Sequence, residues 1–212
     1  MSNTKEFDIK RNEIIDFAEQ LFTSRGYEDT TVNAILKKVG IAKGTFYYYF
    51  ESKEEVMDAV IMRFIDEDFE LAKKTLKKKD IHSFDKLLTC LFSRPKSTEK
   101  KVMIEQLYES NNALMKQRSM QLAIEIICPV YADIISEGNQ SKEFNSAHPL
   151  ADIQFLMAGM QTLFDLSNIK GSTIQIDVEA VVNAMFRILK IDETKHSKEQ
   201  TLKKIIEGIG AQ

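Results

Sequence analysis

The sequence predicts an all-α protein, a fold class built only from helices. Apolar residues recur at three- and four-residue steps along most of the 212 residues. Runs in which Val, Ile and Thr alternate with polar residues are missing from the sequence, which argues against a sheet. Only three prolines, at Pro95, Pro129 and Pro149, interrupt the helical pattern. Because 43% of the residues are hydrophobic, the chain is also apolar enough to bury a substantial core.

The first three predicted helices have clear start and stop signals. They cover residues 8–25, 32–38 and about 43–49. Gly26 and Gly40 follow the first two, and glycine commonly closes a helix in the left-handed conformation. Thr30 or Thr31 can cap the second helix. Two short helices joined by a glycine-containing turn, with a longer helix packed behind them, are typical of a helix-turn-helix.

The remaining predicted helices form a larger part of the chain. Ser52 and Glu55 make a capping box, in which the two side chains bond to backbone N–H groups at the helix start. Asp80 is expected to cap the next helix, and a second capping box, Ser197 with Gln200, starts the last one. The predicted ranges are 52–79, 80–92, 98–111, 114–137, 149–168, 177–190 and 197–209. The sequence therefore predicts a three-helix head, residues 1–51, joined by one long helix to a helical body, residues 52–212.

Charge, cysteine spacing and hydropathy indicate the compartment in which the protein is expected to lie. The formal net charge of -3 gives no global attraction to nucleic acid, so such a partner must meet a local patch. Cys90 and Cys128 lack the spacing of metal ligands and are expected to be buried in a reducing compartment. The N-terminus lacks the apolar core of a signal peptide. No stretch approaches the ~20 uninterrupted apolar residues of a membrane span. We therefore expect a cytoplasmic protein with no membrane partner.

Residues 40–50, GIAKGTFYYYF, contain five consecutive aromatic residues. On a helix, Phe46 and Phe50 lie one turn apart and share a face, so both can enter the core of the head. Tyr47 and Tyr48 fall on other faces, where their hydroxyls can reach a phosphate while the rings pack on the sugar. The run therefore predicts a surface that meets the DNA backbone.

The residues that start this helix are suited to base edges. Gly44 has no side chain, so a broad partner can approach the backbone. Lys43 can donate to a guanine edge, and Thr45 offers a methyl or hydroxyl contact. Two such residues give little specificity, whereas a dimer doubles them and sets two heads about one DNA turn, ~34–36 Å, apart. We therefore expect a homodimer on near-palindromic, double-stranded operator DNA.

Residues 31–53, TVNAILKKVGIAKGTFYYYFESK, resemble the DNA-binding segment of the tetracycline-repressor (TetR) family of bacterial transcription regulators. The family pattern has a Thr that opens the second helix, a Gly at the turn, a Lys-Gly-Thr-aromatic-Tyr recognition helix and a Lys at the start of the fourth helix. The resemblance covers about residues 8–60. Leu36 and Val39 depart from it, because the family favours Ala there, and Ala42 replaces a frequent capping Ser.

The resemblance implies roles for individual residues. Lys43, Gly44 and Thr45 would lie in the major groove. The phosphate contacts would come from Thr31, Tyr47, Tyr48, Tyr49 and Lys53. Residues 1–51 would form the DNA-binding domain, with the helix-turn-helix motif at about 31–50, and residues 52–212 would bind a ligand and form the dimer.

The helix predicted at 149–168 is apolar on almost every side, so two of its sides are expected to be buried. Its polar residues Gln154, Gln161 and Asp165 share one narrow stripe. In the resembling family, the last two large helices form a four-helix bundle with the partner chain, and the first of them borders a ligand cavity. The stripe therefore either fixes the register of a dimer interface or faces a pocket. In a pocket, Asp165 would meet a cationic or hydroxylated ligand.

Two sets of body residues are candidates for these surfaces. Methionine suits adaptable pockets but is also ordinary core filler, and a buried tyrosine hydroxyl needs a partner. The candidate pocket residues are Met103, Tyr108, Met120, Tyr131, Met157, Gln161 and Asp165. The candidate dimer-interface residues are Gln154, Phe155, Met160, Val182 and Phe186.

The sequence does not indicate an enzyme. His82, His148 and His196 lie in unrelated segments, and no HExxH, GxSxG or glycine-rich phosphate loop occurs. We expect no cofactor and no metal. The prediction is a DNA-binding transcription regulator, chiefly a repressor that a small apolar ligand releases from its operator. A ligand-independent architectural DNA binder or an activator remains the alternative.

Overall fold

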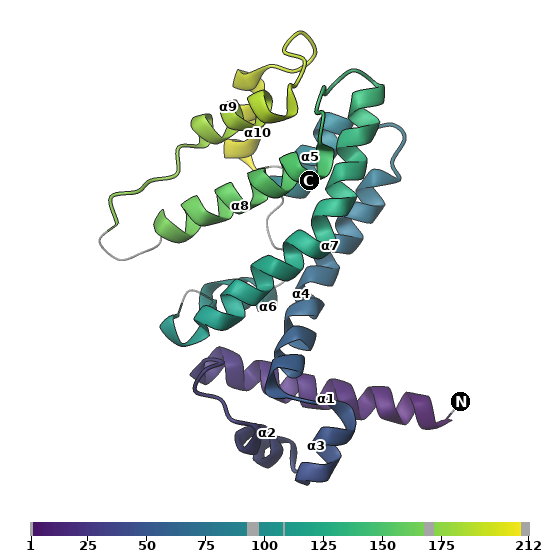
Figure 1. The fold of residues 1–212 in the computed structure, drawn as a ribbon, viewed down its shortest axis with the longest axis vertical. Helices are drawn as coiled ribbons and strands as arrows, with labels where there is room; N and C mark the ends of the chain where they lie inside the picture. Colours follow the sequence, from purple (N-terminus) through teal and green to yellow (C-terminus); the bar gives the residue numbers. More distant parts are fainter. Residues whose placement is uncertain (1, 93–97, 108, 168–171, 209–212) are drawn as a thin grey trace. The chain divides into compact units, whose positions relative to one another are not determined.

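The computed structural model describes residues 2–92, 98–107, 109–167 and 172–208, and within these residues the protein is all-α, as predicted (Figure 1). The helices are α1 Ser2–Arg25, α2 Val32–Val39, α3 Lys43–Tyr49, α4 Lys53–Leu76, α5 Ser83–Phe92, α6 Thr98–Gln106, a short 3-10 helix Ser110–Asn112, α7 Ala113–Gln140, α8 Pro149–Ser167, α9 Val178–Leu189 and α10 Lys198–Glu207. The chain forms two compact units. Unit 1 comprises Met1–Ile65 and Lys96–Gln121, and unit 2 comprises Asp66–Pro95 and Leu122–Gln212.

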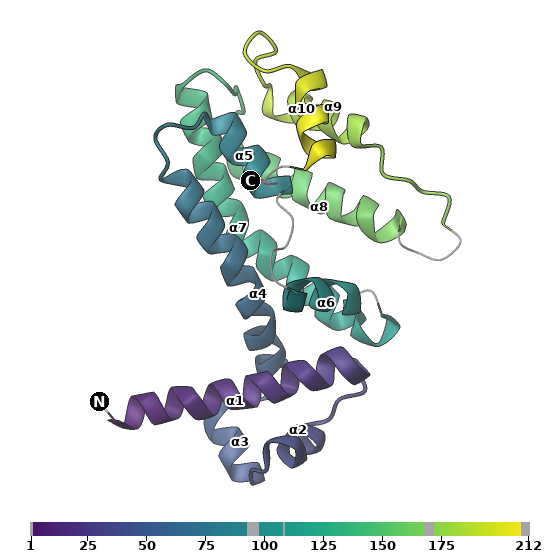
Figure 2. The same cartoon turned by 180° about the vertical axis from the view of Figure 1, so that it is seen from behind.

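Unit 1 contains the predicted helix-turn-helix. Helix α1 lies along the pair α2 and α3, as Figures 1 and 2 show from opposite sides. Phe46 and Phe50 are only 0% and 1% exposed, which confirms that these two aromatics enter the core. Ile35 of α2 and Val56 of α4 are equally buried. The apolar face of each short helix therefore packs into one small core.

Unit 1 is completed by residues distant in sequence. Helix α1 ends at Gly26, whose φ of +88° turns the chain, so the N–H of Tyr27 has no partner in the helix. The Asn112 side chain accepts from it at 2.6 Å and donates to the Gln106 carbonyl at 2.9 Å. Helix α6 consequently ends at Gln106, whereas the sequence predicts a helix up to residue 111. A segment more than 80 residues away thus closes the corner after α1.

The predicted helix caps are largely confirmed. Thr31, and not Thr30, caps α2 by accepting from the Ala34 N–H at 3.1 Å. Ser52 accepts from the Glu55 N–H at 3.1 Å. The Glu55 carboxylate reaches the N–H of Glu51 at 2.6 Å, one residue earlier than in the predicted capping box. Each bond provides a partner for an N–H at a helix start, where the helix itself supplies no acceptor.

Two predicted boundaries in unit 2 are wrong because distant side chains fix them. Helix α4 ends at Leu76, whereas the sequence predicts residue 79. At Leu76, the buried ammonium of Lys86 donates to the backbone carbonyl at 3.1 Å. Asp80 does not cap α5, which begins at Ser83. The carboxylate of Glu143 instead accepts from the backbone N–H groups of Ser83 and Phe84, at 3.3 and 3.1 Å.

Among the described residues, one helix, α7, is long and apolar enough by composition to cross a membrane. Core helices of soluble proteins pass the same test. Helix α7 buries Met115, Cys128 and Ile134 inside the protein, and it carries charged residues such as Arg118 and Glu137. Part of its apolar surface is therefore buried in the core.

Candidate nucleic-acid interface

The start of α3 is open to a partner. Lys43 and Gly44 are exposed and Thr45 is half-buried. Apart from its two chain neighbours and the nearby backbone of α3 itself, a Cβ atom added to Gly44 would meet no atom within 4 Å, and the backbone there has no positive φ. The fold itself therefore has no need of glycine at position 44, and any such need must come from a partner that approaches closely.

Three lysines of the helix-turn-helix are exposed. Lys37 and Lys38 lie in the last turn of α2, and Lys43 opens α3; all three side chains are exposed. The Lys43 ammonium lies 5.9 Å from the centre of the Tyr47 ring. No carboxylate of a described residue pairs with any of the three. Unpaired exposed ammonium groups on two adjacent helices are suited to the phosphate backbone of DNA.

The three tyrosines of α3 differ in exposure. Tyr47 and Tyr48 are 48% and 69% exposed, whereas Tyr49 is half-buried. Phe7 covers Tyr49 at a ring-centre distance of 4.7 Å and also touches Tyr48 at 5.6 Å. Helix α1 begins at Ser2, not at residue 8 as the sequence predicts, so Phe7 belongs to its helical surface. Tyr47 and Tyr48 thus offer more surface to DNA than Tyr49.

Lys53 has a role that the sequence does not reveal. Its ammonium donates to the carbonyls of Tyr27 and Thr30, both at 2.9 Å, and lies 4.0 Å from the centre of the Tyr27 ring. Burial lowers the pKa of Lys53, although the neighbouring Glu54 opposes this. Lys53 therefore fastens the start of α4 to the loop before α2. Two of its three N–H bonds are used, so its phosphate contact, like that of Thr31, remains a prediction.

The candidate pocket residues are divided between the two units. Met103 and Met120 belong to unit 1, while Tyr131, Met157, Gln161 and Asp165 belong to unit 2; Tyr108 lies outside the described residues. The hydroxyl of Tyr131 donates to the Cys90 carbonyl at 3.1 Å, and burial raises its pKa. The Gln161 side chain donates to Asp165 at 2.7 Å. Their role in a ligand pocket remains a prediction.

The candidate dimer residues differ in exposure. Phe155 is 70% exposed, and Gln154 and Met160 are half-buried. Val182 and Phe186 are 1% and 3% exposed in the single chain. Little of their surface is open to a partner in the single chain, and their role in a dimer interface remains a prediction. They pack in the core of unit 2.

Helix α8 nevertheless carries an exposed apolar face. Phe155 and Leu163 are eight residues apart and share one side of the helix. Gly159 lies between them, where an added Cβ would meet nothing. Leu163 is 42% exposed. Large exposed apolar side chains on one side of a helix favour an interaction surface.

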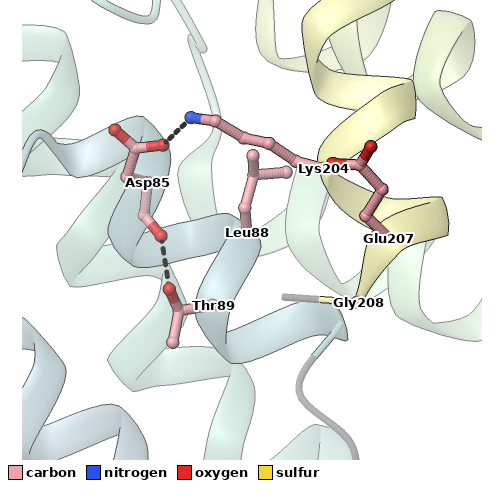
Figure 3. Close-up of a pocket in the computed structure, with 6 residues that line it drawn as sticks. All are labelled: Asp85, Leu88, Thr89, Lys204, Glu207 and Gly208. Carbon is pink, nitrogen blue, oxygen red and sulfur yellow. Dashed lines mark hydrogen bonds and ion pairs between the residues drawn. The ribbon is translucent and has the colours of Figure 1, made fainter. Parts of the chain in front are cut away.

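Unit 2 also contains two adjoining pockets that sequence reasoning misses. The larger, of about 500 Å3, is lined by polar and charged residues that include His82, Glu143, Lys195 and His196. The smaller, of about 280 Å3, lies between α5 and α10 (Figure 3). Asp85 and Lys204 line both pockets and form an ion pair at 2.7 Å. Carboxylates and lysines both line these pockets, and the described residues contain no group of three or more His, Cys, Asp and Glu side chains that could hold a metal ion.

Glu143 is the buried carboxylate of this region. Besides the two N–H groups of α5, it accepts from Ser141 at 2.7 Å and lies 3.2 Å from Nε2 of His196. The His196 ring stacks on Phe84 with a centre distance of 4.1 Å. All polar contacts of Glu143 therefore serve to join three segments of unit 2. No pattern in the polar segment around residue 143 signals this role.

Comparison with known proteins points to transcription regulators. Residues 14–60 match the family described as bacterial regulatory proteins, tetR family. The HTH-type transcriptional repressor KstR2 of Rhodococcus jostii (strain RHA1) is 40% identical over 60 residues, 28% of this chain and 29% of that protein. The match thus spans less than a third of that relative's length. The HTH-type transcriptional regulator YfiR of Bacillus subtilis (strain 168) is 26% identical over 155 residues, 71% of this chain and 76% of that protein.

The fold is shared over nearly the whole chain. The crystal structure of RolR in complex with resorcinol is similar with a TM-score of 0.65, covering 95% of this chain and 96% of that chain. The two sequences are 14% identical, so the likeness concerns the fold.

Proposed function

The chain belongs to the TetR family of bacterial regulatory proteins, whose members are DNA-binding transcription regulators and not enzymes, and from this premise we propose that it is a homodimeric repressor. It binds a near-palindromic operator through α3, and a small apolar ligand bound in the helical body releases it. Such a regulator acts where the chromosome lies, so we expect a cytoplasmic protein.

The open start of α3 supports the DNA-binding part of the proposal. Lys43, Gly44 and Thr45 would face base edges in the major groove. Lys37, Lys38, Tyr47 and Tyr48 on the same two short helices are exposed, and their ammonium and hydroxyl groups suit phosphates. The chain has no internal reason for glycine at position 44. This last observation carries the proposal, since it separates the needs of the fold from those of a partner.

The apolar face of α8 supports the dimer. Phe155 and Leu163 are large apolar side chains that are 70% and 42% exposed on this helix. A second copy of the chain would cover this face and set two heads on one operator.

Two helices could transmit the effect of ligand binding in the body to the DNA-binding heads. Helices α4 and α7 each begin in unit 1 and end in unit 2. A ligand that binds one arrangement of unit 2 more tightly would therefore shift the population toward that arrangement and alter the spacing of the heads.

Gly44→Ala is the mutation that tests the DNA interface. Alanine should stabilise unit 1 by about 0.5–1 kcal/mol, because it favours a helix more than glycine does. The added methyl group should nevertheless weaken operator binding by about tenfold, since it holds DNA away from the backbone. Fluorescence anisotropy with the duplex selected from a randomised pool, together with thermal unfolding, measures both effects. The control is Lys203→Ala on α10 of unit 2, whose side chain is 74% exposed and which should leave the operator affinity unchanged. Unchanged operator affinity of Gly44→Ala would contradict the assigned interface.

Ligand release has its own test. A panel of small apolar and phenolic compounds, with resorcinol as the first, is titrated into the complex of protein and selected duplex. We expect at least one compound that binds the protein to lower its operator affinity. Asp165→Asn should change this response if the stripe of α8 faces the pocket, and should change dimerisation if it faces the partner. A compound that occupies the body without changing operator affinity would favour a ligand-independent DNA binder.

A further inference from the structure

The first turns of α1 hold the far end of α3. The ring of Phe7 lies 4.7 Å from that of Tyr49 and 5.6 Å from that of Tyr48, and the two tyrosine rings lie 5.0 Å apart. The Phe7 and Tyr48 rings meet edge to face at 75°, an arrangement that aromatic pairs prefer. The three rings therefore form one cluster, which we call the Phe7 cluster.

A second contact fastens the same end of α3. Arg11 lies one turn after Phe7 on the same face of α1, and its guanidinium stands 4.7 Å from the centre of the Phe50 ring. Phe50 is the residue at which α3 ends. Phe7 and Arg11 thus place one side of α1 against the last turn of α3.

Helix α3 depends on such contacts. It has only 7 residues, KGTFYYY, and Ala42 at its start makes no side-chain cap. Glycine, threonine and tyrosine are modest or poor helix formers, and a helix of this length is not stable alone. Its shape and the directions of its side chains must therefore come from the residues that pack against it.

Tyr48 is the residue for which this packing has a functional consequence. It is 69% exposed, and an exposed side chain ordinarily samples several rotamers. Contacts from Phe7 and Tyr49 on the ring limit the rotamers that it can adopt. Restricting a side chain before it binds removes part of the entropy that binding would otherwise cost.

We infer that Phe7 is a positioning residue for DNA binding, which acts by holding the ring of Tyr48 so that its hydroxyl meets a phosphate. Phe7 itself is half-buried and has no polar group, so its effect passes through Tyr48. The inference rests on the proposed function, because it requires that α3 binds DNA.

A double-mutant cycle tests the coupling between Phe7 and Tyr48. The probe is a fluorescein-labelled duplex of mixed sequence at low salt, since phosphate contacts do not depend on sequence. Tyr48→Phe removes only the hydroxyl and should weaken binding about fivefold, the size of one net hydrogen bond. Phe7→Leu should weaken binding by a similar factor. In the Phe7→Leu protein, Tyr48→Phe should then cost less than about twofold, because the hydroxyl is no longer held in place.

Two controls separate positioning from a general loss of structure. Leucine is a better helix former than phenylalanine, so Phe7→Leu leaves α1 intact, which circular dichroism verifies. Ile9→Ala removes an apolar side chain that is 60% exposed on the same helix, and it should leave affinity for the duplex unchanged. An equal loss in Ile9→Ala and Phe7→Leu would overturn the inference.

The remaining outcomes separate failure of the Phe7 inference from failure of the proposed DNA-binding function. If the unmutated protein binds the duplex but Tyr48→Phe costs the same in both backgrounds, or costs nothing, the positioning role of Phe7 is refuted and DNA binding stands. If the unmutated protein does not bind the duplex, the proposed function fails, and this inference fails with it.

Discussion

Phe155→Asp is expected to lower operator affinity by about a hundredfold or more, because it separates the two copies of the chain. Phe155 is 70% exposed on the apolar face of α8, and near a twofold axis one substitution places two carboxylates in the interface. Burying an unpaired charge is strongly unfavourable. Once the copies separate, the two heads bind independently, and the gain from linked binding, about 10²–10⁴ in affinity, is lost.

Two measurements check this expectation. Sedimentation velocity reports the oligomeric state, and anisotropy with the selected duplex reports the affinity. The matched control is Ile206→Asp on α10, an equally exposed apolar residue of unit 2 at 63%. It should change neither quantity. A Phe155→Asp protein that stays dimeric would show that the α8 face does not form the interface.

Glu143→Ala is expected to lower the free energy of unfolding by about 3 kcal/mol, with no direct effect on the DNA surface. The carboxylate is 3% exposed and accepts from the N–H groups of Ser83 and Phe84 and from the hydroxyl of Ser141. Removing the carboxylate leaves these buried donors without an acceptor. Each unsatisfied donor costs about 1–3 kcal/mol of folding free energy when no water molecule takes the place of the carboxylate. Urea unfolding followed by circular dichroism measures the loss. Glu207→Ala, which removes a carboxylate that is 66% exposed, should change stability by no more than about 0.5 kcal/mol.

The same substitution should flatten the acid dependence of stability. Burial by itself would raise the pKa of Glu143, but hydrogen bonds from Ser141, Phe84 and Ser83 and the proximity of His196 leave it below the usual 4.5. A carboxyl group with a lowered pKa in the folded state stabilises the protein above its unfolded pKa, and that contribution disappears as the pH falls.

His196 acts in the same direction at a higher pH. Burial lowers its pKa below the usual 6.5, although Glu143 opposes this. The unfolded chain therefore takes up the proton first, and stability falls as the pH falls below about 6.5. Charges that face His196 are those of Glu143, Asp85 and His82. The unmutated protein should lose stability on acidification, and Glu143→Ala should lose less as the pH falls below about 4.5, because it has no Glu143 carboxylate to protonate. An identical acid dependence in both proteins would contradict the role given to Glu143.

The sequence predicts the helices but not all of their ends. Helix α3 begins and ends as predicted because its signals, Gly40 and the aromatic spacing, are local. Helix α5 begins three residues later than expected because its N–H groups find Glu143, 60 residues away. Helix α1 begins at Ser2, where its early turns pack on tyrosines of α3 through Phe7. Periodicity cannot report partners so distant in the chain.

In the candidate site, too, the sequence predicts the features that depend on local spacing and does not predict those that depend on distant contacts. The inward direction of Phe46 and Phe50 follows from helical spacing alone, and the structure agrees. The internal bonds of Lys53 do not follow from spacing, because its acceptors are backbone carbonyls of a loop. Val182 and Phe186 fit the pattern of an interface helix, but the same pattern also describes a core helix. Only the packing of unit 2 distinguishes these two environments.

The bonds of Asn112 to the corner after α1 have a consequence for engineering. TetR-like regulators invite chimeras, in which the head of one protein is grafted onto the sensor of another. A graft joined at residue 51 would leave the N–H of Tyr27 without the Asn112 side chain and the N–H of Glu28 without the Asn111 carbonyl, which accept from them at 2.6 and 3.0 Å. A transplantable head of this protein therefore comprises two pieces of chain, and a hybrid regulator should carry residues 98–121 along with the helix-turn-helix.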